Sequence, residues 1–164
     1  MSADTHVLQP DHLPTPFTAD EIRRGCPPGR TIRMLVTTPD ADPLVRVTRF
    51  VTGDADGADQ EFWTEAPDGR RLVEPERRRS TWLDFQGHAS MPAATTVRSA
   101  EVIEIPAGRF DCLKYVRREG DSVTTFWFAR SAPGMPLRFE ETDGGRLVYR
   151  ATAIEDTGAS RPEA

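Results

Sequence analysis

The stretch "IPAGRFDCLKYV", residues 105–116, decides the fold because a tight turn in it is followed by a strand. Pro106 has the fixed φ that the second position of a type I turn requires. Gly108 supplies the left-handed residue of a three-residue hairpin loop with a bulge. We therefore expect two antiparallel strands to meet here.

The strand after this turn holds a carboxylate, a thiol, an amine and a phenol within a few residues. Successive side chains of a strand point to opposite faces. Cys112 and Lys114 therefore point away from the face that carries Asp111 and Tyr115. Because the four reactive groups do not converge on one substrate atom, we interpret the stretch as a hairpin and not as an active site.

The same alternation, with turn residues between the segments, continues through the last third of the chain. The predicted strands there are residues 95–105, 109–118, 122–130, 136–142 and 146–154. Their connections contain "PAG", "EGD", "APGMP" and "DGG", which are typical turn sequences. Further upstream, the predicted strands are "TIRMLVTT" (31–38), "LVRVTRFVT" (44–52), "DQEFWTE" (59–65) and "RRLVE" (70–74).

Two segments have helical features instead. In "FTADEIRRGCPPG" (17–29), Thr18 and Glu21 have capping-box spacing, and Phe17 and Ile22 have the spacing of a hydrophobic staple. In "RRRSTWLDFQGHASMP" (77–92), Ser80 or Thr81 is the expected N-cap, with Trp82, Phe85 and Ala89 at helical spacing.

These elements predict a mainly β (α+β) fold: a curved antiparallel sheet, or half-barrel, of about nine strands. Two short helices accompany the sheet, and one of them plugs its concave side. We expect an extended N-terminal segment at 1–16, a single β domain at 17–155 and a disordered tail at 156–164.

Composition excludes several classes of function. The chain has 164 residues and a formal net charge of -5, which disfavours nucleic-acid binding. The first residues lack the apolar core of a secretory signal, and no segment is apolar enough to span a membrane. A cytoplasmic location is therefore expected. Cys26 and Cys112 are the only cysteines, so no disulfide framework is predicted.

Candidate chemistry is sparse. The chain has no His or Cys motif with metal-ligand spacing and no phosphate-binding glycine loop, so neither a metal nor a cofactor is expected. The acidic stretch "GDADGADQE" (53–61) is interpreted as a β-turn rather than a calcium loop. A catalytic arrangement of Cys112, His88 and an aspartate remains an alternative to a buried, inert thiol.

Large aromatic side chains are the remaining feature of the sequence that indicates a binding site. "TFWF" (125–128) makes both faces of its strand apolar, so one face packs the core and the other needs a cover. The helix, a ligand or a second subunit would each supply that cover. The predicted ligand-binding residues are Trp63, Trp82, Phe85, His88, Tyr115 and Trp127.

The motifs "PAG-x-FDC" (106–112) and "TFWFARSAPGMPLRFEE" (125–141) are similar to those of a group of small bacterial proteins. That group resembles the half-barrel class of the lipoprotein carrier LolA and the pigment-biosynthesis protein VioE. The resemblance covers roughly residues 31–154 and implies an apolar or aromatic ligand on the concave face, under the helix. VioE-like members act without metal or organic cofactor, but no catalytic position of VioE is matched here.

Three functions are compatible with these features. The first is a cytoplasmic protein that binds a small apolar or aromatic molecule. The second is a cofactor-free, VioE-like enzyme that shapes a reactive intermediate by positioning it and excluding water. The third is a homodimeric protein-interaction module that uses an exposed sheet edge or the apolar face.

Overall fold

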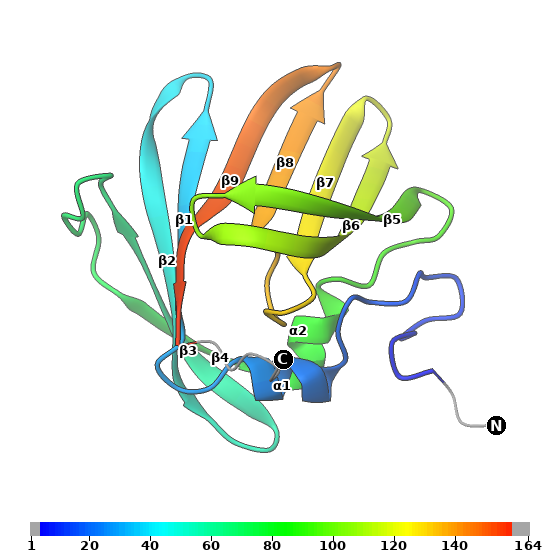
Figure 1. The fold of residues 1–164 in the computed structure, drawn as a ribbon, viewed down its shortest axis with the longest axis horizontal. Helices are drawn as coiled ribbons and strands as arrows, with labels where there is room; N and C mark the ends of the chain where they lie inside the picture. Colours follow the sequence, from blue (N-terminus) through cyan, green and yellow to red (C-terminus); the bar gives the residue numbers. More distant parts are fainter. Residues whose placement is uncertain (1–3, 159–164) are drawn as a thin grey trace.

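Nine strands form one antiparallel sheet in the order β4-β3-β2-β1-β9-β8-β7-β6-β5. The computed structural model describes residues 4–158. The strands are β1 (Thr31–Thr38), β2 (Ala41–Gly53), β3 (Gly57–Glu65), β4 (Glu76–Thr81), β5 (Thr96–Ile105), β6 (Gly108–Glu119), β7 (Ser122–Ala129), β8 (Arg138–Asp143) and β9 (Arg146–Thr157). Figure 1 shows a strongly curved sheet in which the β5–β6 hairpin crosses in front of β9 and β8. The predicted fold class, a curved antiparallel sheet with two short helices, is confirmed.

The hairpin of residues 105–116 forms at the predicted place, with a tighter loop than predicted. Ile105 pairs directly with Gly108, so Pro106 and Ala107 form a two-residue loop without the bulge. Gly108 has a φ of 144°, which explains why glycine stands there. The tip of the hairpin reaches β9, where the N–H of Ala107 donates to the carbonyl of Ala153 at 3.2 Å.

The fourth predicted strand, "RRLVE" at 70–74, is wrong. The strand lies at Glu76–Thr81 instead, and Gly57 pairs with Thr81 at its end. β4 is an edge strand whose side chains are almost all exposed, so the sequence carries no apolar alternation to mark it.

β9 is longer than the predicted strand 146–154. It continues to Thr157, which pairs with Thr31 of β1, whereas the predicted tail began at residue 156. The rest of that predicted tail, residues 159–164, lies outside the described residues.

Both predicted helices form, as α1 (Ala19–Gly25) and α2 (Trp82–Gly87). Each starts with a complete capping box, Thr18 with Glu21 and Thr81 with Asp84. The two helices contact one another in the mouth of the curved sheet (Figure 1). No helix in the described part of the chain is long and apolar enough to cross a membrane.

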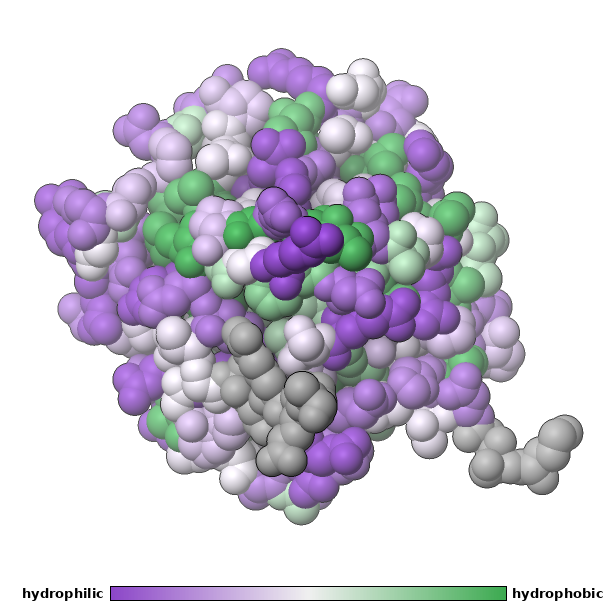
Figure 2. Space-filling model, viewed as in Figure 1, coloured by the Kyte–Doolittle hydropathy of each residue, from purple (hydrophilic) through white to green (hydrophobic). Residues whose placement is uncertain are grey.

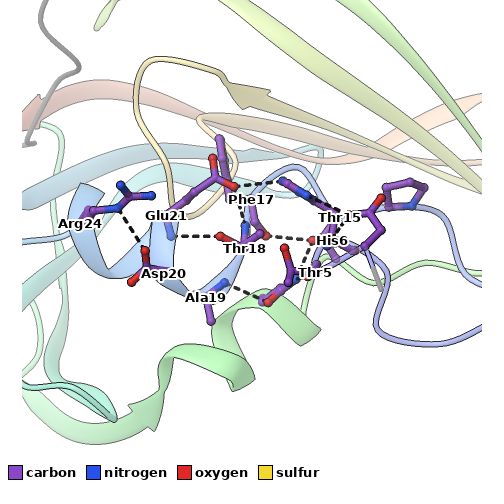
Figure 3. Close-up of polar contacts among 12 residues, drawn as sticks. Thr5, His6, Thr15, Phe17, Thr18, Ala19, Asp20, Glu21 and Arg24 are labelled. Atoms are coloured by element: carbon purple, nitrogen blue, oxygen red, sulfur yellow. Dashed lines mark hydrogen bonds and ion pairs between the residues drawn. The ribbon is translucent and has the colours of Figure 1, made fainter. Parts of the chain in front are cut away.

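The segment before α1 is held against the helices by polar contacts. Gln86 is 2 % exposed, accepts a hydrogen bond from the N–H of Ala19 and donates to the carbonyl of Thr5 and the hydroxyl of Thr15. The imidazole of His6 lies 3.0 Å from the Glu21 carboxylate (Figure 3). Residues 4–16 thus form part of the folded domain and cover its helical end.

A buried ion pair joins three distant segments. The Arg30 side chain is fully buried and binds both carboxylate oxygens of Asp156, at 3.0 and 2.9 Å. A third nitrogen of Arg30 donates to the carbonyls of Gly25 and Pro133. The pair therefore connects the end of α1, the loop between β7 and β8, and the end of β9.

Candidate ligand-binding cleft

The concave face of the sheet can be assigned from strand register, because directly opposed residues share a face. Phe126 is opposite Phe139, which is opposite Ala151, which is opposite Val36. The helices pack on this same face, since the ring of Phe17 makes an edge contact with Phe128. The concave face is thus the one that holds Phe126 and Phe128, and Trp127 lies on the convex face.

A cleft of about 530 Å³ lies on the concave face, across β1, β2, β3, β8 and β9. This volume is within the range that small-molecule sites occupy, roughly 300–1,000 Å³. Its lining combines apolar and aromatic side chains with a few charged and hydroxyl groups. The lining residues are Met34, Arg46, Val47, Thr48, Phe62, Trp63, Thr64, Val73, Glu74, Glu76, Arg78, Met135, Phe139, Tyr149 and Ala151.

A ladder of stacked aromatic rings leads into the cleft, where its last two members, Phe139 and Tyr149, form part of the lining. Phe128 stacks on Phe126 at 6.2 Å between centroids, Phe126 on Phe139 at 6.1 Å, and Phe139 on Tyr149 at 5.1 Å. The four rings come from three adjacent strands, and their planes are nearly parallel. Phe139 and Tyr149 were not predicted as site residues, although their alternation within "RFEETD" and "RLVYRAT" places them on one face.

Two arginines provide the cationic groups of the cleft. The Arg46 guanidinium donates to the Tyr149 hydroxyl at 3.3 Å, and Arg78 pairs with Glu76 at 3.0 Å. Arg78 also lies over the ring of Phe62, 5.6 Å from its centroid. These groups can orient a polar or anionic substituent of a ligand whose body lies against the aromatic wall.

A second, smaller pocket of about 190 Å³ lies under the helices. Phe17, Phe50, Phe85 and Phe128 line it, so it is mainly apolar, with polar groups from Gln60, Gln86 and His88. Met135 lines both this pocket and the cleft. The two hollows are therefore neighbours, and a flexible thioether side chain stands between them.

The structure brings only some of the predicted ligand-binding residues together. Phe85 and His88 line the small pocket. Trp82 and Tyr115 are buried in the helix–sheet core, where the Trp82 indole donates to the carbonyl of Asp54 and the Tyr115 hydroxyl to that of Pro14. Their polar groups already have partners within the protein.

Trp63 and Trp127 direct their indoles at carboxylates. Trp63 donates to Glu65 at 2.8 Å, and Trp127 donates to Glu101 at 2.6 Å. The hydrogen bond from Trp127 lowers the pKa of Glu101, and Lys114 adds to that effect. Trp63 is among the residues that border the cleft, but strand register places its side chain on the same face of the sheet as Trp127.

The Glu65 carboxylate gives a pH dependence that can be measured. Burial opposes its ionisation, but hydrogen bonds from Trp63 and Arg33 outweigh burial, so its pKa lies below the usual value. A carboxyl whose pKa falls on folding stabilises the protein above its unfolded pKa, and this stabilisation is lost as the pH falls through the folded value. We expect Glu65→Gln to lower the free energy of unfolding by about 1–2 kcal/mol at pH 7.

Urea titrations of wild type and Glu65→Gln at pH 7 and at about pH 3 check this expectation. The difference between the two proteins should shrink at the lower pH, which lies below the unfolded-state pKa, because the stabilisation from the ionised carboxyl is progressively lost there. An unchanged difference at both values would contradict the proposed ionic role of Glu65.

The structure places Cys112 where its thiol is unreactive. Burial raises the pKa of the Cys112 thiol to about 11, so it is protonated at neutral pH and is a weak nucleophile. Cys112 packs in the cluster with Met34 and Phe110, whereas His88 lines the small pocket. Residues 4–158 include no group of three or more His, Cys, Asp or Glu side chains arranged to hold a metal ion.

No protein-family model and no curated protein matches the sequence. Among solved structures, MucB is similar over 88% of this chain, with a TM-score of 0.60 and 11% identity. MucB in complex with MucA(peri) is similar over 84%, with a TM-score of 0.58 and 11% identity. A Bacteroides fragilis protein, described as a candidate exported protein with a YmcC-like fold, matches over 82% of this chain and 99% of its own length, at 10% identity and a TM-score of 0.49.

The likeness to MucB establishes the fold. These neighbours are β-rich bacterial proteins of the LolA-like family, which agrees with the half-barrel architecture that the sequence resemblance implied. The present chain spans 52% and 57% of the length of the two MucB chains. The fold is compatible with a protein that binds a ligand or a partner.

The predicted cytoplasmic location is wrong. The finding that overturns it is the likeness to MucB, a periplasmic protein, one structure of which contains MucA(peri). The prediction was a default drawn from the composition of the first residues, and it had no support from the fold.

Proposed function

We propose that this protein binds a small apolar or aromatic molecule in the concave cleft. The observation that carries the proposal is the cleft of about 530 Å³ with stacked aromatic rings along one wall. Burial of a flat apolar body against Phe139 and Tyr149 supplies the affinity. Arg46, next to Tyr149, and Arg78 orient a polar substituent.

Of the six residues predicted from the sequence, Trp63 is the one that borders the cleft. Phe85 and His88 belong to the adjoining apolar pocket, which is suited to a small extension of the ligand beyond Met135. The site that we propose therefore centres on Phe62, Phe139 and Tyr149. The pocket under the helices would hold a small additional part of the ligand.

A second candidate is the binding of a protein segment on the same face. MucB, which shares this fold, has been solved in complex with MucA(peri). A peptide that carries one aromatic or aliphatic side chain would place that side chain on the ring ladder. Competition between such a peptide and a small aromatic probe would reveal a shared site.

Fluorescence titration with anilinonaphthalene sulfonate, a flat aromatic anion, tests the proposal. We expect Phe139→Leu to weaken binding about tenfold, which corresponds to about 1.4 kcal/mol, because the leucine cannot stack on the probe. Leu83→Ala serves as the matched control, since Leu83 is 59% exposed on α2 and lies outside the cleft. Equal affinities for wild type and Phe139→Leu, with both proteins folded, would exclude the ring ladder as the binding surface.

A further inference from the structure

The open sheet has two edges, β4 and β5, and they differ in how they are protected. β4 carries Arg77, Arg78 and Arg79 in succession, and charged side chains discourage pairing with another strand. β5 has neither proline nor lysine, and its residues 97–102 are exposed. Val97 and Val102 are 64% and 51% exposed, which is unusual for an edge strand of ten residues.

The free backbone groups of β5 can be assigned from one hydrogen bond. The N–H of Arg118 donates to the carbonyl of Thr95 at 2.8 Å, so odd-numbered residues of β5 direct their backbone groups toward β6. The backbone N–H and C=O of Arg98, Ala100 and Val102 therefore point away from the sheet. Within residues 4–158, no backbone hydrogen bond from another segment reaches these three residues.

The surface around this edge is mixed rather than uniformly polar. In the view of Figure 1 the β5–β6 hairpin crosses the front of the molecule. Figure 2 shows hydrophobic residues along the same band, interrupted by hydrophilic ones. An edge of this kind is suited to a partner strand with apolar side chains and compensating charges.

We propose that β5 pairs with β5 of a second copy of this chain, antiparallel, with the two-fold axis at Ala100. Two-fold pairing within one continuous sheet requires residues of equal parity to face one another. With the axis at Ala100, Val97 faces the partner's Ile103, and Arg98 faces the partner's Val102. Arg98 also lies diagonal to the partner's Glu104, within reach of an ion pair on each side of the axis.

Two other registers of the β5–β5 pairing are less favourable because they place like charges directly opposite one another. An axis at Glu101 sets two glutamates directly opposite, and an axis at Arg98 sets two arginines opposite. With the axis at Ala100, the two copies of Glu101 are diagonal neighbours. Each of them is already neutralised within its own chain, by Lys114 at 3.2 Å and by the indole of Trp127. The register with its axis at Ala100 thus avoids both of these direct like-charge contacts.

Sedimentation equilibrium on the full chain, over a wide concentration range, tests the pairing. We expect reversible association of the 18.3 kDa chain to a dimer, with Kd on the order of 10⁻⁴ M because the interface is small. Arg98→Glu or Glu104→Arg alone should raise Kd about tenfold, and the two changes together should restore it. A monomer at all concentrations, or a Kd that neither single change affects, would overturn the proposal.

Amide hydrogen exchange supplies a readout that does not depend on any variant. As concentration rises, the N–H groups of Arg98, Ala100 and Val102 should become protected, whereas those of Ser99 and Glu101 should not change. Protection of both sets, or of residues on another surface, would assign the association to a different contact.

Discussion

Replacing Asp156 by asparagine is expected to lower the free energy of unfolding by about 3–5 kcal/mol. The change removes the counter-ion of Arg30, whose guanidinium is fully buried. An arginine cannot escape this cost by losing its proton, because its pKa lies far above neutral pH. Urea unfolding followed by circular dichroism measures the loss.

The matched control for this change is Asp111→Asn. Asp111 also pairs with an arginine, Arg130, at 3.7 Å, but its side chain is 66% exposed. An exposed pair contributes about 0–1 kcal/mol, so the control should unfold close to wild type. Equal effects of the two substitutions would show that the buried pair does not hold the three segments together.

Replacing Gly57 by alanine is expected to cost about 1–3 kcal/mol. A Cβ at this position would meet the backbone oxygen of Ser80 and approach the Cα of Thr81 at 3.0 Å. Both contacts belong to β4, which pairs with β3 at this point and leads directly into α2. The backbone must shift to make room, and we expect the shift to loosen the junction of β4 and α2.

Gly87→Ala is the control for the change at Gly57. Gly87 is the last residue of α2, and a Cβ added there has no heavy atom within 4 Å. Alanine is expected to be neutral there or to stabilise the protein by up to about 1 kcal/mol. Thermal unfolding of both variants gives the comparison, and a Gly57→Ala protein that is as stable as wild type would contradict the crowding seen at β4.

Much of the fold could be predicted from the sequence because local chemistry and the global arrangement agree. Gly108 and Gly134 both adopt positive φ, at the turns where glycine was expected. Thr18 caps the first helix as predicted, and Thr81, one of the two expected N-caps, caps the second. β4 was missed because an edge strand with exposed side chains shows no apolar alternation.

The candidate site was harder to predict because it depends on which face of the sheet is concave. Large rings were predicted as ligand-binding residues because of their size. Four of them have their polar group hydrogen-bonded within the protein: Trp63, Trp82, Tyr115 and Trp127. Trp63 borders the cleft, but so do Phe139 and Tyr149, which were not predicted and whose neighbours in space come from strands far apart in the sequence. Strand order and register decide that proximity, and a single sequence does not contain them.

Amide chemical-shift mapping on ¹⁵N-labelled protein, titrated with anilinonaphthalene sulfonate, tests the central claim most directly. We expect the largest shifts along the cleft, at Met34, Phe62, Phe139, Tyr149 and Ala151, with smaller ones under the helices. Shifts confined to the convex face around Lys114 and Trp127, or no shifts at saturating probe, would contradict the assignment of the concave cleft as the binding site.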